Sequence, residues 1–210
     1  SDPSAPFAVA IDTTALANGN HTLTARAFDA AGNTGTSPAV TVNVQNGGGG
    51  GAVLLETFSS ASGADNPGWS FGGWALSTAK DATGTAGSRS LTASAAPRFN
   101  SVTQTATWSG LALGSAPRLS YMRTLSLSDA NISASAGFSV IINDGSDHVV
   151  DQKAISGFTS YTEASFTARA DLDLSAFAGK TVTLKLVVTA RDTSSTVTSA
   201  TAFVDQIKLQ

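Results

Sequence analysis

Two acidic residues stand out as the side chains best placed to do chemistry. Glu56 lies in the stretch VLLETF and Asp205 in AFVDQIKL, where polar and apolar residues alternate. Strand alternation puts Glu56 on the same face as Leu54 and Phe58. It puts Asp205 on the same face as Phe203, Ile207 and Leu209, so we expect each acid to point toward the core. A lone buried carboxylate is costly, so each acid needs a cation, several backbone N–H donors or a proton.

The two acids lie near opposite ends of the same long segment. If its first and last strands are neighbours, Glu56 and Asp205 approach one another, and a hard cation with oxygen ligands, Ca²⁺ above all, would neutralise both. The alternative is that each acid reaches solvent at a strand end or pairs with a nearby cation such as Lys208 or Arg89. The sequence leaves both possibilities open.

Aromatic side chains form the second candidate group, because flat rings stack on the C–H faces of sugars. The candidates are Trp69, Trp74, Trp108, Tyr121 and Tyr161. Trp69 and Trp74 follow a loop rich in Gly, Asn and Pro, where exposure is plausible. Tyr121 alternates with leucines and is expected in the core. For every one of these rings, packing in the core is the alternative to ligand binding.

No arrangement typical of a catalytic centre is present. The two histidines, His21 and His148, have no nucleophile and orienting acid in a recognisable pattern. The run of five glycines lacks the Lys-Ser/Thr of a phosphate-binding loop. Asn143, Asp144 and Gly145 favour a hairpin turn, because these residue types tolerate a positive φ. The alternative, a calcium-binding loop, lacks the required spacing and the distal Glu. We therefore expect no enzymatic activity from this chain.

Composition narrows the choice of partners. The 210 residues carry a net charge of −3, with 13% charged and 41% hydrophobic residues and no cysteine. Basic residues are sparse and never clustered, which argues against nucleic acid and anionic membranes as partners. No apolar run approaches the roughly 20 residues of a membrane helix. Disulfides and thiolate metal sites are excluded.

The elements that must position these side chains are strands. Period-two alternation of β-branched and aromatic residues recurs between Gly, Asn, Asp, Ser and Pro. About ten short strands after the glycines predict an all-β fold over residues 52–210, either a two-sheet antiparallel sandwich or a jelly roll. Residues 47–51 are read as a flexible glycine linker. Residues 1–46 hold only two or three strands, which are marginal alone.

The first segment contains three motifs in order: DTTALANG, HTLTARAFDAAGN and the closing VTVNVQN. In these pieces it is similar to the C-terminal half of a bacterial immunoglobulin-like domain. The opening strands of that family are missing, so we expect the sequence to begin within such a domain. The resemblance implies that residues 1–46 are poorly ordered or exchange strands with another copy.

The long segment contains four characteristic stretches: LLETFSSASGADNPGWSFGGWALS, GSRSL, DLSAFAGKTVTLKLVV and AFVDQIKLQ. In these it resembles the galactose-binding-like jelly rolls that accompany secreted bacterial hydrolases, a group that includes carbohydrate-binding and peptidase-associated modules. It implies a structural Ca²⁺ held by Glu56, the loop around Gly87 and Ser88, and Asp205. Gln206 stands where relatives often have a second acid, which leaves the number of ligands open.

Together these observations predict a non-catalytic ancillary module of a secreted, extracellular bacterial hydrolase. Its expected partner is a polysaccharide or another insoluble polymer, bound through Trp69, Trp74 and Trp108. The alternative is a structural, adhesion or protein-polymer-binding domain of the same fold without a sugar site. Burial of the three tryptophans would favour that alternative.

Overall fold

The computed structural model describes residues 11, 13, 19–44, 54–59, 63–85, 88–194 and 197–210. The chain divides into two compact units, Ser1–Gly49 and Gly50–Gln210. The division falls inside the glycine run, whose residues lie outside the described ranges. Within those ranges, no helix has the length and apolar character needed to cross a membrane.

The N-terminal unit contains two antiparallel strand pairs. In one pair β1 (Gly19–Leu23) lies beside β4 (Val40–Val44), and in the other β2 (Arg26–Phe28) lies beside β3 (Thr34–Thr36). The turn between β2 and β3 is held by Asp29, whose carboxylate accepts hydrogen bonds from the N–H groups of Ala31 and Asn33 at 3.0 and 2.8 Å. Every residue of β2 and β3 is exposed. Its immunoglobulin-like identity and strand exchange between copies both stay predictions.

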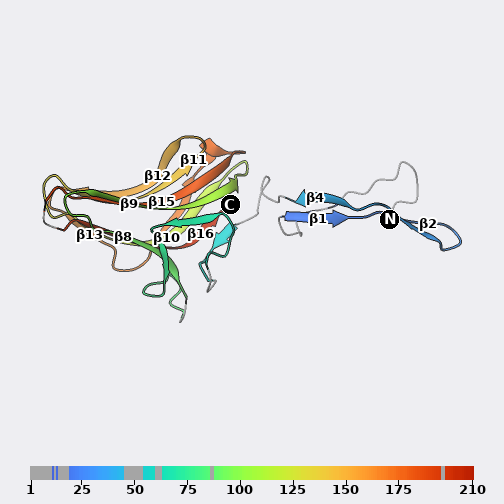
Figure 1. Cartoon of the computed structure of the whole chain (residues 1–210), viewed down its shortest axis with the longest axis horizontal. Helices are drawn as coiled ribbons and strands as arrows, with labels where there is room; N and C mark the ends of the chain where they lie inside the picture. The colour runs from blue at the N-terminus through green and yellow to red at the C-terminus, as the bar shows by residue number, and fades with distance from the viewer. Residues whose placement is uncertain are drawn as a thin grey trace. The chain divides into compact units, whose positions relative to one another are not determined.

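The large unit is a sandwich of two antiparallel sheets, one of seven strands and one of five (Figure 1). The seven-stranded sheet contains β13 (Ser160–Thr162), β10 (Arg118–Ser128), β16 (Ser199–Leu209), β8 (Ser90–Ala95) and β7 (Ala75–Ser77), with β14 (Thr167–Asp173) beside β10 and β5 (Leu54–Glu56) beside β16. The five-stranded sheet contains β12 (Asp147–Ser156), β11 (Ser135–Asn143), β15 (Thr181–Arg191), β9 (Ser101–Ala112) and β6 (Trp69–Gly72). One 3₁₀ turn, Ser175–Phe177, precedes β15. The predicted all-β two-sheet fold is confirmed.

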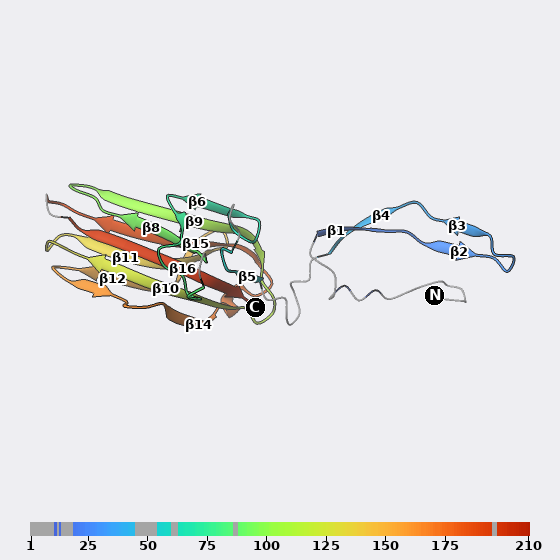
Figure 2. The same ribbon diagram turned by 90° about the horizontal axis from the view of Figure 1, so that it is seen from below.

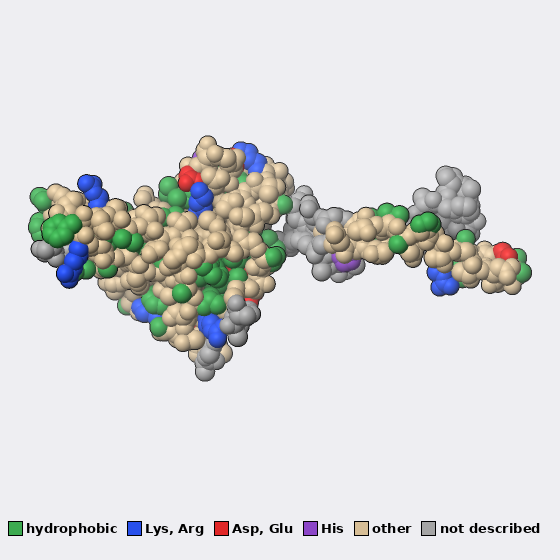
Figure 3. Space-filling model, viewed as in Figure 1, with side chains coloured by type: hydrophobic (Ala, Val, Ile, Leu, Met, Phe, Trp, Pro, Cys, Tyr) green, Lys and Arg blue, Asp and Glu red, His purple; other side chains and the backbone are tan. Residues whose placement is uncertain are grey.

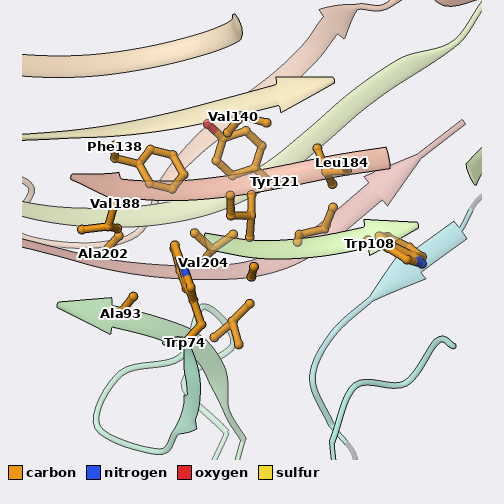
Figure 4. Close-up of a cluster of buried hydrophobic side chains, with 14 of the residues drawn as sticks. Trp74, Ala93, Trp108, Tyr121, Phe138, Val140, Leu184, Val188, Ala202 and Val204 are labelled. Atoms are coloured by element: carbon orange, nitrogen blue, oxygen red, sulfur yellow. The ribbon is translucent and has the colours of Figure 1, made fainter. Parts of the chain in front are cut away.

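Alternate residues of the long strands meet between the sheets and form the core (Figure 4). Phe138 of β11 is fully buried, and its ring lies 6.4 Å from that of Trp74 and 6.3 Å from that of Tyr121. Val204 and Ala202 of β16 face the same interior. Burying apolar side chains from both sheets is the main source of stability in such a sandwich.

The last strand, β16, is central to the seven-stranded sheet. It pairs with β10 along one edge and with β8 and β5 along the other (Figure 2). The prediction that the first and last strands of residues 52–210 lie side by side is therefore confirmed. An irregularity interrupts the β10–β16 register between Ser120 and Met122, and Gln206 on the facing strand has a positive φ of 49°. Such a bulge reverses the faces to which the following side chains point.

Candidate ligand-binding groove

The segment between β7 and β8, residues 78–89, folds over the outer face of the seven-stranded sheet (Figure 1). Residues 86 and 87 of it lie outside the described ranges. The Ala82 N–H donates to Asp205 Oδ2 at 2.9 Å, and the Ser90 hydroxyl donates to the Lys80 carbonyl at 2.6 Å. Lys80 Nζ lies 5.5 Å from the ring centre of Phe203. These contacts fasten the segment to the sheet.

The register between β10 and β16 shows which face of the seven-stranded sheet residues 78–89 cover. Asp205 lies opposite Met122, and Phe203 lies opposite Thr124. Cross-strand partners point to the same face of a sheet, and the intervening Val204 belongs to the core. Phe203 and Asp205 therefore face outward, and Asp205 is buried by the loop above it. The sequence expectation of a buried Asp205 is confirmed, but the side chain is covered by the loop and does not point into the core between the sheets.

A groove of about 640 Å³ lies between this loop and the segment that joins β13 to β14. Its floor comes from β10, and its two walls come from the two loops. Figure 3 shows hydrophobic side chains reaching the surface on the side of the sandwich from which the long loop projects. The lining residues are Lys80, Asp81, Ala82, Thr83, Gly84, Met122, Thr124, Ala164, Ser165 and Phe166.

The lining combines apolar surface with polar groups at its edges. Met122 and Phe166 provide the apolar part, and Asp81, Thr83 and Ser165 provide donors and acceptors. Binding sites for small or chain-like ligands have this composition, because the apolar area supplies binding energy and a few polar groups fix orientation. The groove volume lies within the usual range of about 300–1,000 Å³ for such sites.

The two acids beside the groove have different electrostatic environments. The Thr83 hydroxyl, with backbone N–H groups of the same turn, lowers the pKa of Asp81, which therefore stays ionised. Burial raises the pKa of Asp205, and the nearby charges of Asp81 and Glu56 add to this effect against two backbone N–H donors. Asp205 does not line the groove. Its role here is to hold the loop through Ala82.

Glu56 has a complete shell of N–H donors. Its carboxylate is fully buried and accepts hydrogen bonds from the backbone N–H groups of Phe58, Asp65 and Asn66 at 2.9, 2.8 and 3.0 Å. The indole N–H of Trp69 donates to it at 3.1 Å. Several N–H donors compensate a buried carboxylate without a cation. Glu56 thus pins the loop after β5 to the sheet and to β6.

The residues predicted to hold Ca²⁺ do not fit a shared ion. Glu56 lies opposite Ile207, which belongs to the core. Asp205 lies opposite Met122, which lines the groove on the outer face. The two carboxylates therefore occupy opposite faces of the same sheet. The oxygens of Glu56 already receive N–H donors. The Ser88 N–H closes a turn onto the Thr85 carbonyl at 3.0 Å. Gly87 lies outside the described residues, and within those residues no group of three or more acids or histidines could hold a metal ion.

The predicted tryptophans pack inside the sandwich. Trp74 and Trp108 are only 4% and 2% exposed, which argues against the predicted stacking of either ring on a sugar. Trp69 is half-buried, and its ring stacks on that of Trp108 with centroids 5.2 Å apart. The indole N–H of Trp108 donates to the Pro67 carbonyl at 3.0 Å. The three rings therefore stabilise the fold in this structure.

The two tyrosines belong to a buried ionic network along the edge where β10, β12 and β14 meet. The Tyr121 hydroxyl donates to Asp151, and burial together with this acceptor raises the pKa of Tyr121. Arg169 binds both carboxylate oxygens of Asp151 at 2.7 and 2.8 Å. The network continues through Arg123 to Glu163, which accepts a hydrogen bond from Tyr161 at 3.0 Å.

Sequence reasoning placed Tyr121 in the core correctly but missed its charged partners. Arg123 alternates in phase with Tyr121 and Leu125, and that in-phase position is the one signal that could have revealed it. A buried arginine needs acids close by. Asp151 lies in β12 and Glu163 follows β13, so sequence spacing alone could not pair either acid with Arg123.

His148 lies in β12, beside the predicted hairpin turn. Its Nε2 lies 3.0 Å from Asp144, and its ring lies against Phe177. Gly145 in the same turn has a φ of 115°, as a tight turn requires. In the described part of the chain, neither His148 nor the groove joins a nucleophile to a base and an orienting acid. The geometry of the groove is suited to binding.

No protein-family model matches the chain, and no curated protein matches it. Solved structures similar to it include the K1 adhesin domain of Lys-gingipain from Porphyromonas gingivalis W83, at 14% identity over 76% of this chain and 98% of that one, with a TM-score of 0.44. A non-crystalline cellulose-specific module, CBM28, has 16% identity, coverage of 80% and 99%, and a TM-score of 0.43. The xylan-binding CBM22-1 domain of Paenibacillus barcinonensis Xyn10C has 12% identity, coverage of 79% and 97%, and a TM-score of 0.38.

Proposed function

We propose that the large unit is a non-catalytic module that binds a polysaccharide chain in the groove between residues 80–84 and 164–166. The groove itself carries the proposal, because it combines an apolar floor with hydroxyl and carboxylate groups at its rim. Phe166 offers a ring for the C–H face of a sugar, and Asp81, Thr83 and Ser165 offer partners for its hydroxyls.

The sequence resemblance places such modules in secreted bacterial hydrolases, and we extend that setting to this chain. A tethered binding module raises the concentration of its attached domains at an insoluble substrate. The glycine-rich run between the two units has the composition of a flexible connection. Secretion, bacterial origin and attachment to an enzyme all belong to the proposal.

Retention by insoluble polymers tests the groove. The full chain is incubated with xylan, amorphous cellulose, chitin, starch and alginate, and the bound fraction is measured by sedimentation. We expect retention by at least one polymer. Phe166→Ala should weaken it about ten-fold, the effect of losing one stacking contact. Val149→Ser, an exposed apolar position on β12, is the matched control and should bind normally.

The second candidate function is a structural or adhesion domain without a sugar site. Burial of Trp74 and Trp108 favours it, because these rings offer no face to a ligand. It predicts no retention by any polysaccharide, or retention that Phe166→Ala leaves unchanged. Either result, with an unchanged melting temperature, would contradict the groove proposal.

A further inference from the structure

Four loops gather at one end of the large unit, shown at its left in Figures 1 and 2. Strand registers bring them together, because Ser128 pairs with both Ser160 and Ser199, while Arg191 pairs with both Ser101 and Ser135. The loops are residues 96–100, 129–134, 157–159 and 192–198, of which 195 and 196 lie outside the described residues. The chain enters this unit at the other end, where β5 pairs with the last residues of β16.

Each of these loops exposes one large apolar side chain. Phe99, Ile132 and Phe158 are 70%, 78% and 67% exposed, and Val197 is also exposed. We call these four residues the tip patch. Figure 3 shows hydrophobic side chains at this end of the unit with Lys or Arg side chains beside them. Single exposed apolar residues are common, but one from each of four adjacent loops is a cluster.

Two members of the tip patch are held in a strained backbone conformation. Phe99 has a φ of 55° and Phe158 a φ of 61°, in the left-handed region that bulky side chains rarely adopt. Glycine or asparagine would occupy these positions with less strain. Because both rings are exposed, packing within the chain does not compensate for that strain. Outliers of this kind concentrate at functional sites.

Hydrogen bonds tie the four loops to one another beneath the tip patch. The Asp192 carboxylate accepts from the Asn131 side chain at 2.7 Å and from the Thr198 N–H at 2.9 Å. The Asp192 N–H donates to the Asn100 carbonyl, and the Asp129 N–H donates to the Thr159 carbonyl, both at 2.9 Å. Polar groups thus point inward while apolar side chains point outward, so the patch is held ready for a partner.

The charge exposed around the tip patch is positive. Asp129 and Asp192 are the acids of these loops, and both are buried. Arg98 lies in the first loop and Arg191 at the edge of the fourth, and both are exposed. The fold therefore presents cations and apolar groups together, in a chain whose net charge is −3.

We propose that the tip patch docks onto an anionic lipid surface. Apolar side chains on separate loop tips can insert between lipid headgroups, while Arg98 and Arg191 bind the negative headgroups around them. A neutral polysaccharide would leave both arginines without a counter-charge. Whole-chain composition argues against a membrane partner, but the fold concentrates at one end the few residues that favour one. This surface is separate from the groove.

Vesicle sedimentation of the full chain tests the proposal. One set of vesicles is phosphatidylcholine, and the other contains equal parts of phosphatidylcholine and phosphatidylglycerol. We expect binding to the anionic set and its loss at high salt. Phe99→Asn with Phe158→Asn should reduce binding about ten-fold or more, since both inserted rings are removed. Arg98→Ala and Arg191→Ala should each reduce it about five-fold.

The asparagine variants separate binding from folding. Asparagine tolerates a positive φ, so the double variant should melt at the same temperature as the parent or higher. Val149→Ser removes an exposed apolar side chain outside the tip patch and should bind vesicles normally. Absence of vesicle binding, equal binding to both vesicle sets, or full binding by the double variant would overturn the proposal. So would loss of polysaccharide retention in the double variant without any vesicle binding, which would assign the loops to the polymer.

Discussion

The two units of this chain use the same kind of sequence to different effect. In the N-terminal unit, β2 and β3 pair through the backbone, yet every residue of both strands is exposed. In the large unit, strands of similar composition place alternate residues between two sheets. Strand pairing is present in both units. A second apolar layer is described only in the large one.

This difference shows which interaction decides stability. An isolated pair of strands gains backbone hydrogen bonds but little buried apolar area, and is marginal in water. Phe28 in β2 is exposed, whereas Phe138 in β11 is fully buried against two aromatic rings. The same side chain therefore contributes little in one unit and much in the other.

Truncating these two phenylalanines gives the largest expected contrast. Phe138→Ala should lower the free energy of unfolding of the large unit by about 3–5 kcal/mol, through lost burial and the cavity left behind. Phe28→Ala should leave that transition unchanged. Denaturant unfolding followed by tryptophan fluorescence measures both, because all three tryptophans lie in the large unit. A comparable loss in both variants would mean that the units unfold together.

Glu56 in the large unit and Asp29 in the N-terminal unit both accept hydrogen bonds from backbone N–H groups, so they extend the comparison of the two units. Glu56→Gln should cost the large unit about 2 kcal/mol or more, because the new amide group faces buried N–H donors. Asp29→Asn changes a similar set of donors on an exposed turn and should leave the unfolding of the large unit unchanged. Leu55→Gln, at an exposed neighbour of Glu56, controls for the substitution itself. An unaffected Glu56→Gln variant would contradict the role assigned to the donor shell.

Acid should weaken the large unit through its buried ionic network. Burial acts to raise the pKa of Asp151, but Arg169, Tyr121 and Arg123 outweigh it, and the net pKa lies below the ordinary 3.8. An acid with a depressed folded-state pKa stabilises the protein above its unfolded pKa, and that contribution disappears as pH falls through the folded value. Melting temperature should therefore decline below about pH 4. Asp151→Asn should melt lower at neutral pH and lose part of this acid dependence.

Chelation is expected to have the smallest effect. Because Glu56 and Asp205 lie on opposite faces of the sheet and Glu56 has its own N–H donors, adding EDTA should leave the melting temperature of both units unchanged. Differential scanning calorimetry with and without added Ca²⁺ measures this. A rise in melting temperature with Ca²⁺ that Asp205→Asn abolishes would restore the predicted metal site.

The sequence could predict what depends on local alternation. The stretches GFSVIIN and TVTLKLVVTA lie within β11 and β15, and the turn at Asn143–Gly145 lies where it was predicted. The pairing of the first and last strands, β5 and β16, was also predicted. Period-two patterning fixes which side chains share a face, and turn residues fix where strands end.

What failed depended on contacts between distant segments. Asp205 faces away from the core because of the bulge at Gln206, and it is buried because the loop that contains Ala82 covers it. Neither the bulge nor the loop contact can be read from the residues around Asp205. Trp74 follows loop-like sequence and Trp108 lies within a long strand, yet the sandwich encloses both rings. The groove itself is bounded by two loops about 80 residues apart in the sequence, so no spacing rule could reveal it.

The hydrogen bond from Ala82 to Asp205 also bears on the order in which the molecule is completed. It joins residues 123 positions apart, and its acceptor belongs to the strand that lies between β10 and β8. During synthesis, those two strands emerge long before the one that must separate them. The hydrogen bond that holds one wall of the groove can form only after β16 has been synthesised and has paired with its neighbours. The groove is therefore completed only when the seven-stranded sheet is complete.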